Sequence, residues 1–289
     1  MRATSFFYVL SWNLKTILRK RHLLLTVLGF GLIGVSSVCY VLLYPSPLKR
    51  NIWDAVLVAF AGPGIWGNSI LDMLRWFVPN VLFLYLFGNI AAGEFDRGGV
   101  FIIPLIGSRK MWWLGKIATL LILSIGYMAL GLVIVVICSM VFLPWSSELS
   151  PFLLSETFLQ RQGDFQIEIL LGWITILFTS TLFAISSLQA ALSIFWKKSF
   201  VAFLAVIAVL IMSWLAGNDH PAIAPWLPGS QSMLLRHTYF DPSVPNFSLA
   251  WSLIYNVVLT SIVSAVSLWC IRRLDIWKDP SDSHMEERQ

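Results

Sequence analysis

Six long runs of apolar residues dominate this sequence and decide its fold class. The runs cover residues 23–43, 76–92, 117–143, 169–195, 200–216 and 250–271. A helix of about 20 apolar residues crosses the roughly 30 Å hydrocarbon core of a bilayer. A water-soluble protein needs a polar surface, but only 12% of these 289 residues are charged, against about 25% in soluble domains. We therefore predict an all-α, polytopic membrane protein with six transmembrane helices.

Lys and Arg are unevenly divided between the two sides of these spans. With a cytoplasmic N-terminus, 15 of the 20 basic residues lie in the cytoplasm, whereas the acidic residues divide seven to eight. Basic loops resist translocation, so we expect both termini to be cytoplasmic. This distribution also explains the net charge of +5 without a nucleic-acid partner. Eight tryptophans lie at or near span ends and are expected at the headgroup level: Trp76, Trp112, Trp113, Trp145, Trp196, Trp214, Trp251 and Trp269.

The segment before the first span has the periodicity of an amphipathic helix. One face carries the apolar residues Phe7, Leu10, Leu14, Ile17 and Leu18, and the other carries Ser11, Lys15 and Arg19. Such a helix lies in the membrane interface and does not cross it. The predicted organisation is an interfacial elbow helix over 1–22, a six-span transmembrane domain over 23–271 and a cytoplasmic tail over 272–289.

Motifs for chemistry are scarce. The sequence contains no G-x-x-x-x-G-K-[ST] phosphate-binding loop, no G-x-S-x-G and no H-E-x-x-H. None of the six apolar runs contains Asp, Glu, Lys, Arg or His, which ion-coupled pathways require. Asp219, His220, His237 and Asp241 share a predicted outer loop, but their spacing matches no familiar metal site. We expect these four to be structural or solvent-exposed, and we assign neither a metal nor a catalytic residue.

Polar side chains follow one face of two spans. They are Ser252, Asn256, Thr260 and Ser264 in the last span, and Thr175, Thr179, Ser186 and Gln189 in the fourth. Hydroxyl and amide groups pair helices inside a bilayer. The stripe therefore indicates helix packing, a mildly polar translocation surface or a subunit interface.

Between the second and third spans, residues 93–110 read GEFDRGGVFIIPLIGSRK. Gly98 and Gly99 end the helical extension of the second span, and Ser108 can cap the third. Residues 100–106 then form a short apolar turn between charged flanks. Such an element is too apolar for a free loop and predicts a docking surface for another protein.

This segment resembles the coupling helix of ABC-2 type permeases, the membrane subunits of ATP-binding-cassette exporters. That family has six spans, and its cytoplasmic coupling helix joins the second to the third. The matching positions are Glu94, Asp96, Arg97, Gly98, residues 100–106, Ser108, Arg109, Gly115 and Lys116. The chain departs from the pattern at Gly99, where Thr is usual, and at Gly107, where Pro is frequent.

The resemblance implies a division of labour. This chain would not be an enzyme and would hold no cofactor, because ATP and Mg²⁺ would bind to a separate cytoplasmic ABC ATPase subunit, present in two copies. Two permease chains, identical or homologous, would form the pathway. The residues implied at the ATPase contact, with a coupling helix near 94–110, are Glu94, Asp96, Arg97, Phe101, Ile102, Ile103, Ser108 and Arg109.

The implied activity is export of an amphipathic substrate, such as a peptide, a toxin or a lipid-like molecule, across a bacterial inner (plasma) membrane. Exporters of this kind often give resistance to antimicrobial peptides. An alternative is a non-transport integral membrane protein, such as an immunity or assembly factor, that acts without ATP. A membrane-embedded enzyme is a third possibility, for which only the outer loop with His220 and His237 offers groups.

Overall fold

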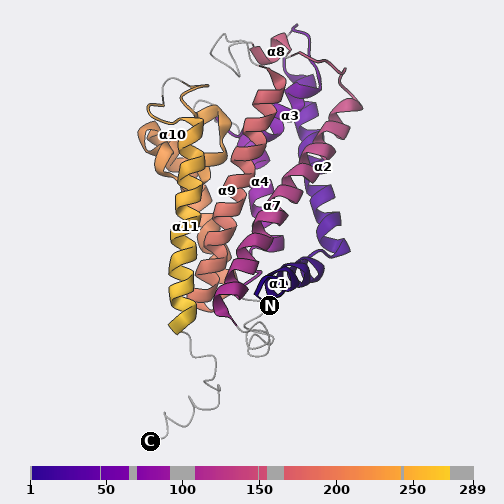
Figure 1. The fold of residues 1–289 in the computed structure, drawn as a ribbon. Coiled ribbons are helices and arrows are strands. Elements are labelled where there is room, and N and C mark those ends of the chain that lie inside the picture. Colours follow the sequence, from indigo (N-terminus) through magenta and orange to yellow (C-terminus); the bar gives the residue numbers. More distant parts are fainter. Residues whose placement is uncertain are drawn as a thin grey trace, which may run out of the picture.

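The structure, a computed structural model, describes residues 2–45, 47–64, 70–91, 108–148, 150–154, 166–241 and 244–273. Within these ranges all regular elements are helical, and six helices are long and apolar enough to cross a membrane. They are α2 (Lys20–Leu43), α4 (Ile70–Phe87), α7 (Arg109–Met140), α9 (Ile167–Trp196), α10 (Ser199–Asp219) and α11 (Leu249–Arg273). They stand side by side as one bundle (Figure 1). The prediction of an all-α, multi-pass membrane protein with six spans is confirmed.

All six long helices begin before their apolar runs, and α4 and α7 begin the furthest upstream. Helix α4 starts at Ile70 and so includes Asp72 and Arg75, and α7 starts at Arg109 and includes Lys116. The apolar runs are therefore shorter than the helices, which carry ionisable residues beyond the ends of the runs. An apolar run ends at the first charge, whereas a helix continues through charged residues whose side chains have polar partners.

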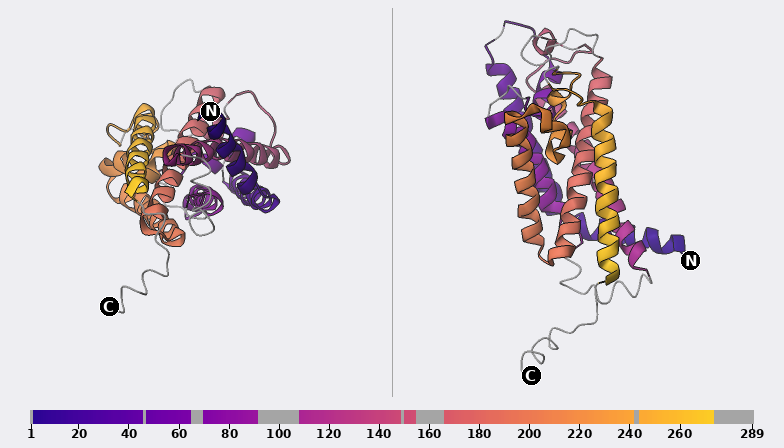
Figure 2. Two further views of the ribbon diagram at one scale, coloured as in Figure 1. Left: turned by 60° about the horizontal axis from the view of Figure 1, so that its bottom comes forward. Right: turned by 90° about the vertical axis from the view of Figure 1, so that its left-hand side faces the viewer.

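Short helices cover one end of the bundle, and we call these elements and their connections the cap. They are α3 (Ile52–Phe60), α8 (Pro151–Leu154), η1 (Pro221–Trp226), η2 (Pro228–Ser232) and η3 (Leu234–Arg236) (Figures 1 and 2). A capping box begins α3: the Asn51 side chain accepts from the backbone N–H of Trp53, and Asp54 accepts from that of Asn51.

Helix α1 (Arg2–Ile17) lies across the opposite end of the bundle, where α2 begins and α11 ends (Figures 1 and 2). The expected N-terminal helix is present. Phe7 and Leu18, from its predicted apolar face, are 65% and 47% exposed, whereas Val9 and Asn13 are buried. Helix α1 packs against α7 through a strip that includes these two buried residues.

Aromatic side chains fill the centre of the bundle. The ring of Tyr127 lies 4.9 Å from that of Phe30 and 5.1 Å from that of Phe83, centroid to centroid. Gly131 makes room for this cluster, because a Cβ there would lie 2.4 Å from the Phe30 ring.

Trp76, Trp112 and Trp113 are also buried, at 1% exposure or less, and belong to the same core. These three rings therefore pack inside the bundle, and their position at the headgroup level stays a prediction.

Candidate functional site

Most of the predicted coupling segment lies outside the described residues. This applies to Glu94, Asp96, Arg97, Phe101, Ile102 and Ile103. Ser108 and Arg109, which end the segment, are described. Ser108 caps α7 by accepting a 3.4 Å hydrogen bond from the backbone N–H of Met111, as predicted. Arg109 donates to the carbonyl oxygens of Ile271 at 2.8 Å and Arg272 at 3.1 Å. The start of α7 is thus joined to the end of α11, where a cation also complements the helix dipole.

The start of α7 also holds α1. Lys116 Nζ donates a 2.7 Å hydrogen bond to Asn13 Oδ1, and Asn13 Nδ2 donates to Thr119 Oγ1 at 3.2 Å. All three side chains are at most 2% exposed. Gly115 permits this approach, because a Cβ there would lie 2.6 Å from a methyl group of Val9. The Gly115–Lys116 pair therefore docks the elbow helix onto α7, a role that the sequence did not predict. We call Asn13, Lys116 and Thr119 the elbow cluster.

The polar stripe of the last span faces the interior of the bundle. Ser252 Oγ lies 2.8 Å from His237 Nε2 and donates to Gln231 Oε1 at 2.8 Å, so it ties α11 to the cap. One turn further, Asn256 Nδ2 donates to Ser180 Oγ at 3.0 Å and Thr181 Oγ1 at 3.1 Å. Ser252 and Asn256 thus pair α11 with the cap and with α9.

Four other predicted stripe residues, Thr175, Thr179, Thr260 and Ser264, take no part in the side-chain hydrogen bonds described for Ser252 and Asn256. Thr260 is 8% exposed, and Ser264 is half-buried. On α9, Thr175 and Thr179 are half-buried, and Thr175 Oγ1 donates to the carbonyl oxygen of Leu171 in its own helix. The structure does not bring these two threonines to Asn256. Their neighbours Ser180 and Thr181 occupy that position instead.

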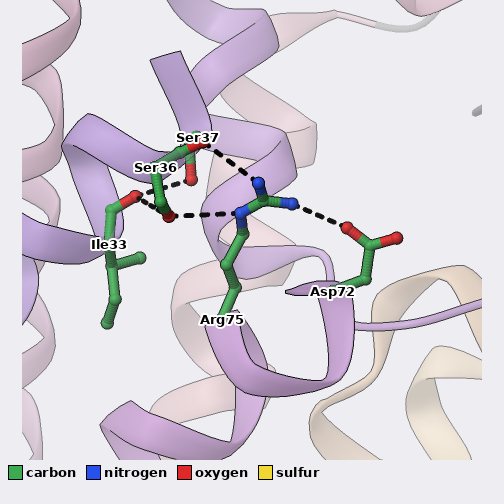
Figure 3. A network of polar contacts seen from close by, with 5 residues as sticks. All are labelled: Ile33, Ser36, Ser37, Asp72 and Arg75. Atoms are coloured by element: carbon green, nitrogen blue, oxygen red, sulfur yellow. Dashed lines mark hydrogen bonds and ion pairs between the residues drawn. The ribbon is translucent and has the colours of Figure 1, made fainter. Parts of the chain in front are cut away.

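An ion pair that the sequence did not indicate lies within α4, and its arginine also contacts α2 (Figure 3). Arg75 Nη1 donates to Asp72 Oδ1 at 2.7 Å, and Arg75 is only 5% exposed. The same guanidinium donates to Ser36 Oγ at 3.3 Å and to the Ser36 carbonyl oxygen at 3.0 Å. Its centre lies 4.8 Å from the Tyr40 ring, within cation–π range. Arg75 therefore clamps two spans together near the cap.

A second buried guanidinium holds the cap. Arg236 is 0% exposed, and it donates to the carbonyl oxygens of Pro63, Ser213 and Trp214, all at 3.3 Å. It also bonds with Ser230 Oγ and with Asn218 Oδ1. Burial lowers the pKa of Arg236 to about 10, so it remains charged at neutral pH.

His237, the next residue, is 0% exposed and stacks on Phe247 with centroids 4.2 Å apart. Burial lowers the pKa of His237 to about 4. Hydrogen bonds with the backbone of Leu234 and Met233 raise this pKa, but their effect is smaller than that of burial. The imidazole is therefore neutral at pH 7. His220 and Asp219 are exposed, and no group of three or more metal-ligating side chains occurs among the residues that the structure describes.

Asp54 ties α3 to the segment after α7. Ser150 Oγ donates to Asp54 Oδ1 at 2.5 Å, and the backbone N–H of Asn51 donates to Oδ2 at 2.7 Å. Burial raises the pKa of Asp54 to about 6, although both hydrogen bonds and Arg50 act to lower it.

Several polar atoms in the interior of the bundle have no hydrogen-bond partner among the described residues. They are Oδ1 of Asn80, Oγ of Ser187, Oε1 of Gln189, Oδ1 of Asn256 and Oγ1 of Thr260, from α4, α9 and α11. An unpaired buried polar atom costs about 1–3 kcal/mol. These groups are available to pair with one another, with water or with a passing molecule if the helices shift.

No protein-family model matches this chain, and no curated protein matches its sequence. The site therefore has to be interpreted from its own geometry.

Proposed function

We propose that this chain is the membrane subunit of an ATP-binding-cassette exporter, driven by a separate cytoplasmic ATPase. The observation that carries the proposal is the docking of α1 at the start of α7, through the elbow cluster and the close approach of Val9 to Gly115. Residues 93–107, which resemble a coupling helix, lead directly into this point. A push on that segment would reach α7 together with α1.

The contact of Arg109 with the end of α11 extends the same connection. Because α11 pairs with α9 through Asn256, displacement of the start of α7 would be passed on to α9 and α11. These helices also contain Ser187, Gln189 and Thr260, whose unpaired polar atoms support a pathway that opens between the spans.

The proposed substrate is an amphipathic molecule, such as a peptide, a toxin or a lipid-like compound, moved outward across the plasma membrane of a bacterium. The apolar and aromatic composition of the predicted outer segments supports this substrate class. The excess of Lys and Arg at the α1 end supports an orientation with that end in the cytoplasm. Two permease chains and two ATPase subunits would make the working transporter.

The test is to purify the full chain with its partners from native membranes and measure ATP hydrolysis. Charge reversal by Glu94→Lys with Arg97→Glu should remove the ATPase subunit or uncouple its activity from substrate. Lys198→Glu, at an exposed cation between α9 and α10 at the same end of the bundle, is the matched control and should leave the complex intact.

The proposal is wrong if no ATPase co-purifies under any mild detergent condition, or if an ATPase co-purifies but the control variant loses it as the double variant does. The alternative, a membrane protein that binds its target without ATP, would then be favoured. It fits the finding that Ser252 and Asn256 already have partners within the chain.

A further inference from the structure

The described acidic residues are confined to one end of the bundle, whereas basic residues occur at both ends. At the α1 end the charged residues with described side chains are all basic: Lys15, Arg19, Lys20, Arg21, Arg109, Lys110, Lys116, Lys197, Lys198 and Arg272. The described acidic residues all lie in the cap or at the cap end of a long helix: Asp54, Asp72, Glu148, Glu168, Asp219 and Asp241. The α1 end therefore presents positive charge that no described carboxylate offsets.

The positive charge is densest where α1 turns into α2. Lys15, Arg19, Lys20 and Arg21 are all exposed, and we call them the elbow cations. Arg19 Nε donates to the carbonyl oxygen of Thr16 at 3.3 Å, and none of the four forms an ion pair with a described residue. Lys20 and Arg21 lie in the first turn of α2, where cations oppose the helix dipole. Lys20 and Arg21 therefore do not stabilise the start of α2.

Aromatic side chains continue this surface along α1. Phe7, Tyr8 and Trp12 are 65%, 59% and 49% exposed, on the side of α1 away from Val9 and Asn13. Lys15 follows Trp12 by three residues and is therefore its neighbour on the helix surface. Aromatic rings beside cations on an interfacial helix match the headgroup depth of a bilayer, where rings and Lys or Arg both find favourable contacts.

We propose that the elbow cations bind the headgroups of anionic phospholipids, with the aromatic face of α1 inserted beside them. A phosphodiester accepts paired N–H bonds from an Arg guanidinium and a point-charge contact from Lys. A lipid such as phosphatidylglycerol keeps its full negative charge, whereas the choline of phosphatidylcholine offsets it. Membrane orientation alone requires only that cations lie on this side, which Lys197 and Lys198 also satisfy. This inference does not rest on the proposed transport function.

The test uses the purified full chain in mixed detergent–lipid micelles, with retained lipids counted by native mass spectrometry. Arg19→Gln with Lys20→Gln is compared with Lys197→Gln with Lys198→Gln, which removes the same charge from exposed positions at the same end. Each phosphate-binding cation near a membrane surface changes affinity by about fivefold. The elbow variant should therefore bind phosphatidylglycerol about 20-fold more weakly, with phosphatidylcholine unchanged, and the control should resemble the wild type.

The wild-type protein supplies the second measurement, which does not depend on the folding of any variant. Phosphatidylglycerol should displace phosphatidylcholine, its retention should fall as salt is raised, and glycerol 3-phosphate should not compete. Equal loss in both variants would overturn the proposal in favour of a diffuse electrostatic effect. Equal competition by glycerol 3-phosphate would indicate a site for a soluble anion, and an absence of preference between the two lipids would also refute it.

Discussion

Removing the Asn13 side chain should loosen α1 from the bundle. In Asn13→Ala, Lys116 loses an acceptor at 2.7 Å and Thr119 loses a donor at 3.2 Å. A hydrogen bond to a charged group contributes about 1.5–3 kcal/mol and a neutral one about 1 kcal/mol. Because these side chains are at most 2% exposed, little water is available to replace either bond. We expect Asn13→Ala to lower the free energy of unfolding by about 3 kcal/mol.

The assay is equilibrium unfolding in mixed micelles of mild detergent and SDS, followed by the fluorescence of the 14 tryptophans. Ser11→Ala, on the exposed side of the same helix, is the control and should change stability by less than about 0.5 kcal/mol. A double-mutant cycle with Lys116→Met isolates the pair and should give a coupling energy of about 1.5–3 kcal/mol. Additive effects of the two substitutions would refute the reasoning, because Asn13 and Lys116 would then not act together.

Three further predictions concern the cap and the core. Because the folded-state pKa of Asp54 is raised from 3.8 to about 6, the native state binds the proton more tightly, and stability should fall by up to about 3 kcal/mol as pH rises from 4 to 6. Asp54→Asn should lack this change when unfolding is measured across the same range. Gly131→Ala should cost about 1–3 kcal/mol through overlap with the Phe30 ring, whereas Gly126→Ala, with open space on the same helix, should be neutral or stabilising in the same unfolding assay. Arg236→Lys should cost about 2–3 kcal/mol, seen as earlier thermal unfolding, because one ammonium cannot reach the acceptors that the guanidinium holds. A Lys variant as stable as the wild type would mean that the cap is held mainly by apolar packing.

The membrane fold could be predicted from the sequence because each span is a long apolar run, and this signal is stronger than any other in the chain. The ends of the spans could not. The charges of Asp72, Arg75 and Lys116 interrupt the runs, yet each has a polar partner from a distant part of the chain or from its own helix. Hydropathy counts such residues as outside a span, and only tertiary contacts place them within the helix.

In the candidate site, too, one part could be predicted from the sequence and another part could not. The spacing of Ser252 and Asn256 predicted that they share one helical face, and in the structure both side chains have hydrogen-bond partners within the chain. The partners on α9 are Ser180 and Thr181. They were missed because the periodicity of one helix does not fix its rotation relative to another. The burial of Arg236 could not be predicted either, because its acceptors are carbonyl groups that only the folded cap brings together.

The central proposal is that residues near Phe101 contact an ATPase. The most direct test places the photo-crosslinking residue benzoylphenylalanine at position 101 of the full chain and irradiates native membranes. Position 145 is the control, because Trp145 is 63% exposed at the cap end. The proposal predicts that the position 101 probe captures a protein with a P-loop ATPase sequence and that the position 145 probe does not. Capture of no ATPase from position 101, with the protein inserted and stable, would contradict it.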